Sequence, residues 1–228
     1  YIFYEDNEGE IKAKRKLTDK EQQEQETKDS WIEGYYLFYK VADKIIRANN
    51  LDTQNWRFAI DSKPKEINAY ATAANLVIIN SSMVDTFYDN PDALAWLIGH
   101  EISHHLFGHM QLTAHAYERI NKLQIGIYNS FLLPGAPLIF LPIYHTKQRI
   151  WYKRIRQTEI EADTEALTLM ARAGFDVDYA NDVLATLSQL PELEKDYRDT
   201  HPKQKQRVEN INKQIALLDI DALRIEGA

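Results

Sequence analysis

The chain has 228 residues, 44% hydrophobic and 27% charged, which is ordinary globular usage and excludes wholesale disorder and a polytopic membrane protein. Its 34 acidic and 27 basic side chains give a formal net charge of -7, which repels a phosphate backbone and excludes nucleic acid as an expected partner. It contains no cysteine, so a metal would be held by His, Asp or Glu, and the cytosol and the periplasm suit it equally.

The N-terminal part predicts a charged arm, a core helix and a small sheet. Residues 1–30 are expected to form a solvated helix or arm outside a single domain over 31–228. Apolar residues recur at helical spacing from Trp31 to Ala48. Three stretches favour strands and predict a small antiparallel sheet. They are Trp56 to Ile60, Ile67 to Thr72 and Leu76 to Ile79.

Helices are predicted for most of the remaining chain. Asp89-Asn90-Pro91-Asp92 is a typical helix start, and this helix should run to about His109. Residues 123–146 contain no Asp, Glu, Lys or Arg, and their three prolines argue against one continuous helix. A helix is expected to resume near His145 and to end around Gly174. Two more should cover about Tyr179 to Leu190 and Pro202 to Leu218.

The helix that follows Pro91 contains His100-Glu101-Ile102-Ser103-His104. Residues four apart share a helix face, so His100 and His104 can bind one ion while Glu101 lies beside it. Catalytic zinc takes three protein ligands and a water, and Glu101 can accept the proton of that water as general base. The alternative interpretation is a helix with two surface histidines beside a glutamate.

A second helix offers the missing ligand. Glu159 and Asp163 are four residues apart, so their carboxylates share one face. Glu159 can be the third zinc ligand, and Asp163 can accept the outer N–H of a ligand histidine and fix its tautomer. Taken alone, this segment could be a solvated acidic face, but its pairing with the upstream motif favours a metal site.

Together these motifs resemble the zinc endopeptidases that include the HtpX-like, BepA-like, mitochondrial Oma-type and CAAX prenyl proteases, all gluzincins with HExxH and ExxAD motifs. The resemblance covers about Ile67 to Ile211, including Asn68-Ala69-Tyr70-Ala71, which is similar to the Asn-Ala-Phe-Ala strand of the family. It implies that Glu159 is the third ligand. Where the family usually has Pro-Gly-Gly this chain has Ala73-Ala74-Asn75, and Asn75 can adopt a left-handed conformation.

The resemblance also implies roles for residues outside the two motifs. Thr200-His201-Pro202 and Arg207 are similar to a family segment in which the histidine can occupy the open zinc position and the arginine steadies the oxyanion. His201 could equally be a helix-start residue, and Arg207 a solvated helix arginine. The strand with Asn68 and Ala69 can bind an extended substrate by edge addition, or it is an ordinary sheet strand. His105 and His109 are expected to pack near the site or support it from outside.

The apolar segment 123–146 cannot be a single membrane crossing, because His100 and His104 would then be separated from Glu159. Two crossings need about forty apolar residues, and only about twenty are present. A buried hairpin that fills the core, a loop near the site and a patch that dips into a membrane stay open. The membrane interpretation is favoured by aromatic and basic residues after the segment. These are Tyr144, Lys147, Arg149, Trp151, Lys153, Arg154 and Arg156.

We therefore expect a predominantly helical α+β, zincin-like metallopeptidase domain with one Zn²⁺ per chain. Its expected function is endopeptidase cleavage of unfolded, misassembled or membrane-associated proteins. Peripheral membrane contact through 123–156 is an alternative to the core-filling interpretation of 123–146. The alternative is a zinc-binding assembly factor or chaperone-like module that holds clients without cleaving them. The start at Tyr1, without Met or an apolar signal segment, is typical of a mature or trimmed form. The soluble family members suggest a periplasmic or membrane-peripheral location in a bacterium.

Overall fold

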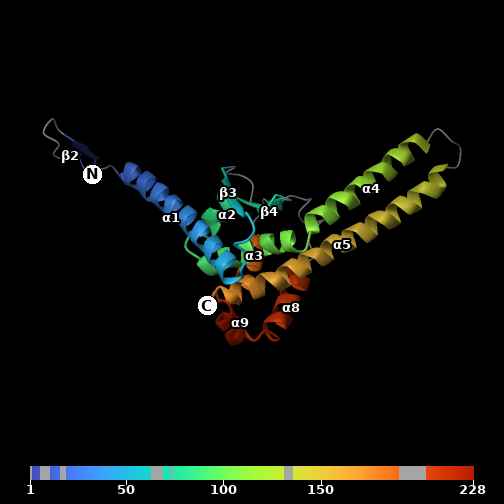
Figure 1. Cartoon of the computed structure of the whole chain (residues 1–228). Helices are drawn as coiled ribbons and strands as arrows, with labels where there is room; N and C mark the ends of the chain where they lie inside the picture. The colour runs from blue at the N-terminus through green and yellow to red at the C-terminus, as the bar shows by residue number, and fades with distance from the viewer. Residues whose placement is uncertain are drawn as a thin grey trace.

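The computed structural model describes residues 2–5, 11–15, 19–62, 69–72, 74–130, 136–189 and 204–228. Two arms diverge from a central body, as Figure 1 shows. One arm is the N-terminal part of a long helix, and the other is a pair of antiparallel helices. The apolar core lies in the body and draws its buried side chains from along the chain, from Phe38 to Ile211.

The first helix, α1 (Asp19–Ala48), begins earlier than the periodicity from Trp31 indicated. Its C-terminal half supplies Phe38, Val41 and Ile45 to the core, each at most 2% exposed. Before it, β1 (Ile2–Glu5) pairs antiparallel with β2 (Ile11–Arg15). The charged composition predicted a helix or an arm at this end of the chain, and the short strand pair is a difference from that expectation.

The small sheet has the strand order β3-β5-β4, with β3 at Arg57–Asp61, β4 at Ala69–Thr72 and β5 at Leu76–Asn80. It is mixed and not wholly antiparallel, because β3 runs parallel to β5 while β4 runs antiparallel to it. The turn between β4 and β5 places Asn75 at φ 55°, so β5 folds back beside β4 and enters the sheet next to β3. Strand β4 is left at an edge of the sheet.

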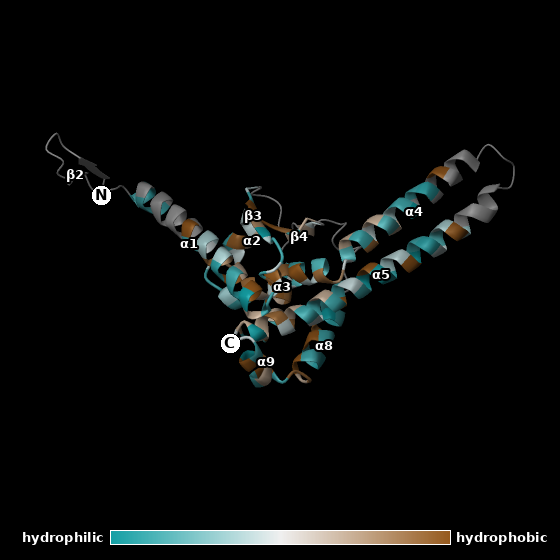
Figure 2. Ribbon diagram, viewed as in Figure 1, coloured by the Kyte–Doolittle hydropathy of each residue, from teal (hydrophilic) through white to brown (hydrophobic). Residues whose placement is uncertain are grey.

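Helix α3 (Pro91–Leu106) follows the short helix α2 (Ser81–Thr86) in the chain and runs through the centre of the body. The Asn90 side chain accepts a hydrogen bond from Ala93 N at 2.9 Å and caps the helix, as expected from the Asn-Pro start. Side chains from Ala93 to Ile98 are all buried, and α3 is partly brown in Figure 2. A helix with so little exposed surface is held on all sides by its neighbours.

Helices α4 (His109–Ser130) and α5 (Ala136–Arg172) form the second arm. The prediction that the helix resumes near His145 was wrong, since α5 begins at Ala136 and contains Pro142. Pro142 is exposed, so the carbonyl left without its N–H partner can bind water. The described side chains at 142–147 are exposed or partly exposed, which corrects the core-filling interpretation for this part. Among the described helices, none is both long and apolar enough to span a bilayer.

The C-terminal helices pack against α3 and α5. Helix α6 (Tyr179–Gln189) follows the end of α5, where Gly174 takes φ 73°, a left-handed conformation that favours glycine. Helices α8 (Gln204–Ile215) and α9 (Ile220–Glu226) then pack along the C-terminal half of α5. This arrangement brings α8 against the buried face of α5 that also contacts α3.

Candidate metal centre

The site lies where α3 crosses α5, and small residues make the close crossing possible. Gly99 lies on α3, and a Cβ built on it would be 3.3 Å from Ala166 Cα on α5. Ala162 and Ala166 are fully buried between the helices. Since neither helix presents a large side chain at the contact, side chains one residue or one turn away can converge between them.

Two histidines of α3 and one glutamate of α5 converge at this crossing. His104 Nε2 lies 3.1 Å from His100 Nε2 and 3.3 Å from Glu159 Oε1, and His100 Nε2 lies 3.5 Å from Glu159 Oε2. One ligand atom from each residue lies within 4.8 Å of the others. Zinc bonds of about 2.0–2.1 Å at tetrahedral angles set ligand atoms about 3.4 Å apart. The donor types and the spacing therefore both fit Zn²⁺.

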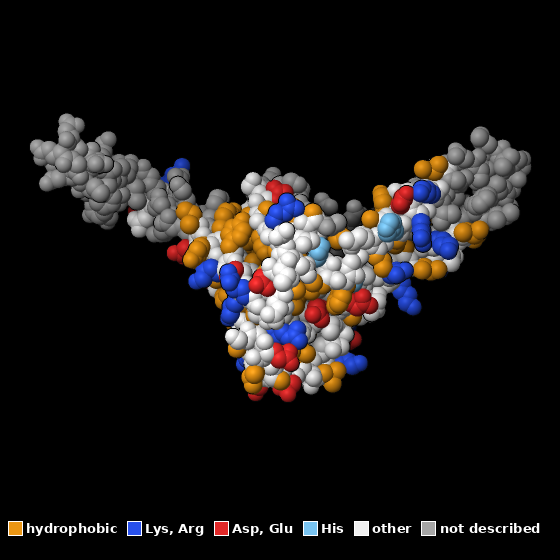
Figure 3. Space-filling view, viewed as in Figure 1, with side chains coloured by type: hydrophobic (Ala, Val, Ile, Leu, Met, Phe, Trp, Pro, Cys, Tyr) orange, Lys and Arg blue, Asp and Glu red, His pale blue; other side chains and the backbone are white. Residues whose placement is uncertain are grey.

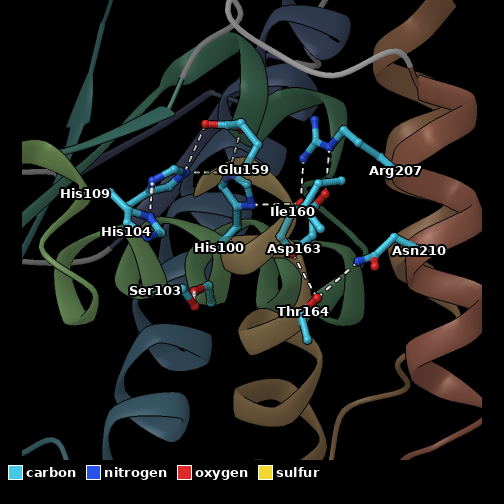
Figure 4. A network of polar contacts seen from close by, with 11 residues as sticks. His100, Ser103, His104, His109, Glu159, Ile160, Asp163, Thr164, Arg207 and Asn210 are labelled. Atoms are coloured by element: carbon cyan, nitrogen blue, oxygen red, sulfur yellow. Dashed lines mark hydrogen bonds and ion pairs between the residues drawn. The ribbon is translucent and has the colours of Figure 1, made fainter. Parts of the chain in front are cut away.

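His100 is supported from behind by a buried ion pair. Its Nδ1 lies 2.9 Å from Asp163 Oδ1, and Arg207 donates to the same carboxylate through Nη2 at 2.7 Å and Nε at 2.8 Å (Figure 4). Asp163 is 0% exposed and Arg207 4%. The guanidinium also lies over the Trp96 ring, 5.5 Å from its centre. Asp163 is therefore held as a charged acceptor beside His100.

These contacts change the acidity of both partners. Burial lowers the pKa of His100, but the hydrogen bonds and charges of Asp163 and Glu159 outweigh burial and raise that pKa to about 10. Burial raises the pKa of Asp163, but the charge and hydrogen bonds of Arg207, with those of His100, outweigh it and lower the pKa below its usual value. The cluster thus attracts positive charge at the point where the ligand atoms meet.

His104 has a different supporting partner. Its Nδ1 lies 3.1 Å from Nδ1 of His109, the first residue of α4, and His109 Nε2 lies 3.3 Å from Glu161 Oε2 on α5. His109 is 4% exposed. Burial lowers the pKa of His109, and the charge of His104 lowers it further. Sequence analysis placed His109 near the site as a packing or supporting residue, but it did not identify the contact of His109 with Glu161.

The general-base candidate, Glu101, follows His100 on α3 and is partly exposed. Within the described part of the chain, the carboxylate of Glu101 makes no hydrogen bond or ion pair. A carboxylate without a structural partner can bind a water molecule or a substrate group next to the metal ligands.

The other predicted site residues are only partly described by the structure. Ala69 lies on the edge strand β4, while Asn68 and His201 lie outside the described residues. Arg207 is buried against Asp163 instead of lying on a solvated face, which corrects the surface alternative. The acidic face of α5 is also divided, since the side chain of Glu159 is 8% exposed and that of Glu161 is 48% exposed. The solvated-face interpretation therefore fails for Glu159 and Asp163.

Comparison with known proteins gives a family and a relative. A model of peptidase family M48 matches residues 38–215. The mitochondrial metalloendopeptidase OMA1 of Arabidopsis thaliana is 27% identical over 188 residues, which cover 78% of this chain. The match covers 35% of the relative, so the chain spans about a third of the length of this curated protein.

Proposed function

The chain belongs to peptidase family M48, a family of zinc metallopeptidases, and from this membership we propose that it is an endopeptidase whose zinc is held by His100, His104 and Glu159. The observation that carries the proposal is the convergence of these three side chains from two helices, with Glu101 beside them on α3. A site that only stored metal would give no reason for an unpaired carboxylate next to the ligands.

Glu101, Asp163 and Arg207 have different roles in the proposed reaction. Zinc, when bound, supplies a Lewis acid that makes a water molecule more acidic. The Glu101 carboxylate accepts the proton of the attacking water and then donates it to the amine nitrogen released as the C–N bond breaks. Asp163 holds the ring of His100, and Arg207 holds Asp163. The contacts of Arg207 support this positioning role in place of the oxyanion role implied by the resemblance. His201 at the open zinc position stays a prediction.

We propose extended backbone of unfolded, misassembled or membrane-associated proteins as the substrate class. Strand β4 lies at the edge of the sheet, and β4 contacts α3, the helix that carries the two histidines. Addition of a substrate strand to such an edge reads main-chain groups and depends little on side-chain sequence. An unfolded segment can extend its backbone along β4 without first leaving a sheet or helix of its own, so this mode favours unfolded segments.

The catalytic part is tested with Glu101→Gln in the full chain. The amide keeps the size of the side chain but cannot accept the proton, so hydrolysis of an unfolded protein such as reduced casein should fall by roughly 10²- to 10⁴-fold. Zinc content should stay at one ion per chain. Glu165→Gln on α5 is a matched control that changes the same charge away from the ligands. Unchanged hydrolysis by Glu101→Gln would refute the catalytic role, and zinc binding without hydrolysis in the unmodified chain would favour the non-cleaving alternative.

The second arm is proposed to contact a membrane, with the protein at the surface of a bilayer in a bacterial periplasm. Figure 3 shows Lys and Arg side chains gathered on the arm of α4 and α5. Residues 123–146 lack charges, and exposed Lys122 and Lys147 stand at their two ends. At the helical rise, 123–130 extends about 12 Å and 136–146 about 16 Å. Half the bilayer core is about 15 Å. The apolar side chains of Ile125 and Ile143, 61% and 42% exposed, favour insertion of this end of the arm to about that depth in the bilayer.

Flotation with phosphatidylcholine vesicles, with and without phosphatidylglycerol, tests the membrane contact. A body with net charge -7 is repelled by anionic lipid, so binding that needs phosphatidylglycerol must come from local basic side chains. Reversing both Lys147 and Arg149 to Glu should weaken binding by at least about 30-fold, at about 1 kcal/mol per charge. Reversing exposed Lys213 and Arg224, on α8 and α9, makes the same change of net charge and should have little effect. Equal losses in both variants would refute a local contact.

A further inference from the structure

The two ligand histidines are supported by chemically different partners. Behind His100 is a carboxylate in a buried ion pair, whereas behind His104 is a second imidazole, His109. His109 itself does not reach the ligand cluster, since the nitrogen of His104 that it contacts is Nδ1, on the far side of the ring from Nε2. It therefore acts on the metal only through His104.

The ring contacts determine where each proton lies. His104 Nε2 faces His100 and Glu159, so a bound metal takes the lone pair of this nitrogen and the proton of His104 must be on Nδ1. That N–H can donate only if His109 Nδ1 is an unprotonated acceptor. The proton of His109 is then on Nε2, where it donates to Glu161 Oε2 at 3.3 Å. A single direction of hydrogen bonding, from His104 to His109 to Glu161, thus sets the tautomer of both imidazole rings.

The backbone holds His109 in this position. Gly108 takes φ 65°, a left-handed conformation between the end of α3 and the start of α4, and this turn directs His109 back toward α3. The ring of Phe107 lies 5.4 Å from that of His109 and limits its movement. Glu161 is two residues from the ligand Glu159 on α5 and lines a hollow of about 680 Å³ between α4, α5 and α8. The chain of contacts therefore joins three helices around the site.

We propose that His109 is a positioning residue for the zinc ligand His104, and that Glu161 orients His109. His109 and Glu161 together set the tautomer and the orientation of the His104 ring, as Asp163 and Arg207 do for His100. The proposal rests on the proposed zinc site. It predicts that the two ligands respond differently to substitution, because His104 depends on a neutral acceptor and His100 on a charged one.

The first experiment measures zinc affinity of the full chain by competition with a chelator, independently of proteolysis. His109→Ala should weaken zinc binding by about 10- to 100-fold. His109→Asn places an amide oxygen near the position of Nδ1, so it should recover much of the affinity. His105→Ala is the matched control, because His105 is adjacent to His104 but packs its ring on Trp56 at 5.0 Å. Its zinc affinity should stay near that of the unmodified chain.

The second readout is the visible absorption spectrum of the Co²⁺-substituted protein, which responds to ligand geometry and not to general stability. His109→Ala should shift the spectrum, while His109→Asn and His105→Ala should leave it close to that of the unmodified chain. If His109→Ala fails to fold, Glu161→Leu removes the acceptor at the exposed end and should also shift the spectrum. Unchanged zinc affinity and an unchanged spectrum in His109→Ala, or an unchanged spectrum in Glu161→Leu when it is the variant used, would overturn the proposal. Failure of the unmodified chain to bind zinc would instead refute the proposed function.

Discussion

Replacement of Asp163 by asparagine tests the buried support of the metal site. The carboxylate receives Arg207 on both oxygens, at 2.7 and 2.8 Å, and Oδ1 also lies 2.9 Å from His100 Nδ1. Asparagine keeps the size but replaces one oxygen with an NH₂ group, which would face an N–H donor. The guanidinium of Arg207, 4% exposed, would lose the charge of Asp163.

The expected cost follows from this geometry. Removing one partner of a buried ion pair costs about 3–5 kcal/mol, because the remaining charge stays out of water. Loss of the carboxylate behind a ligand histidine should also weaken zinc binding by about 10- to 100-fold. Urea unfolding of the zinc-free protein measures the first effect, and chelator competition measures the second. The two effects have different origins, so they can be separated by a second substitution.

The double variant Asp163→Leu with Arg207→Met removes both charges and fills the space with apolar groups. It should regain most of the lost stability, since apolar replacement of a buried pair is often neutral or stabilising. Zinc affinity should remain weak, because His100 Nδ1 would have no acceptor. The reasoning is refuted if Asp163→Asn unfolds at the same urea concentration as the unmodified chain and binds zinc equally well.

The remaining predictions concern pH and two structural positions. In the folded protein the pKa of Asp163 lies below its usual 3.8, so ionised Asp163 stabilises the fold fully above about pH 4. This stabilisation is lost as the pH falls through the folded pKa. The difference in unfolding free energy between the unmodified chain and Asp163→Asn should therefore narrow in acid. Gly227→Ala would place a Cβ 2.0 Å from Arg172 O, so α9 should detach and become susceptible to limited proteolysis, and an unchanged digestion pattern would contradict this contact. Asn90→Ala removes the cap of α3 and should lower the unfolding free energy by about 1 kcal/mol without changing zinc affinity, and a larger loss of zinc would show that the cap also positions His100.

The residues that meet at the candidate metal centre could be predicted because their information is local. His100 and His104 on one helix, and Glu159 and Asp163 on another, are related by the fixed spacing of four residues, whatever surrounds them. The start of α3 was equally local, since Asn90 followed by proline carries the capping signal. Secondary structure that depends on a few neighbouring residues was therefore predicted well.

Features that depend on distant segments could not be predicted in the same way. The parallel pairing of β3 with β5 is a choice between strand orders, and no short pattern distinguishes them. Pro142 indicated a helix break, but the exposed surface of α5 lets the helix continue through it. From the sequence Arg207 could be an oxyanion residue or a solvated arginine, and only the packing of α8 on α5 places it against Asp163, 44 residues earlier.

The candidate site therefore depends on four helices, although its proposed metal ligands come from two. Helix α3 supplies His100 and His104, α5 supplies Glu159, α8 supplies Arg207 behind Asp163, and α4 supplies His109 behind His104. A ligand side chain keeps its geometry only if its outer partner is itself held. Here Arg207 of α8 holds Asp163 behind His100, His109 of α4 lies behind His104, and both helices pack against α5. Movement of α4 would thus disturb His104 and leave His100 in place, whereas movement of α8 would do the reverse. Because α4 is also half of the arm proposed to contact a membrane, a tilt of α4 would reach His104 through His109.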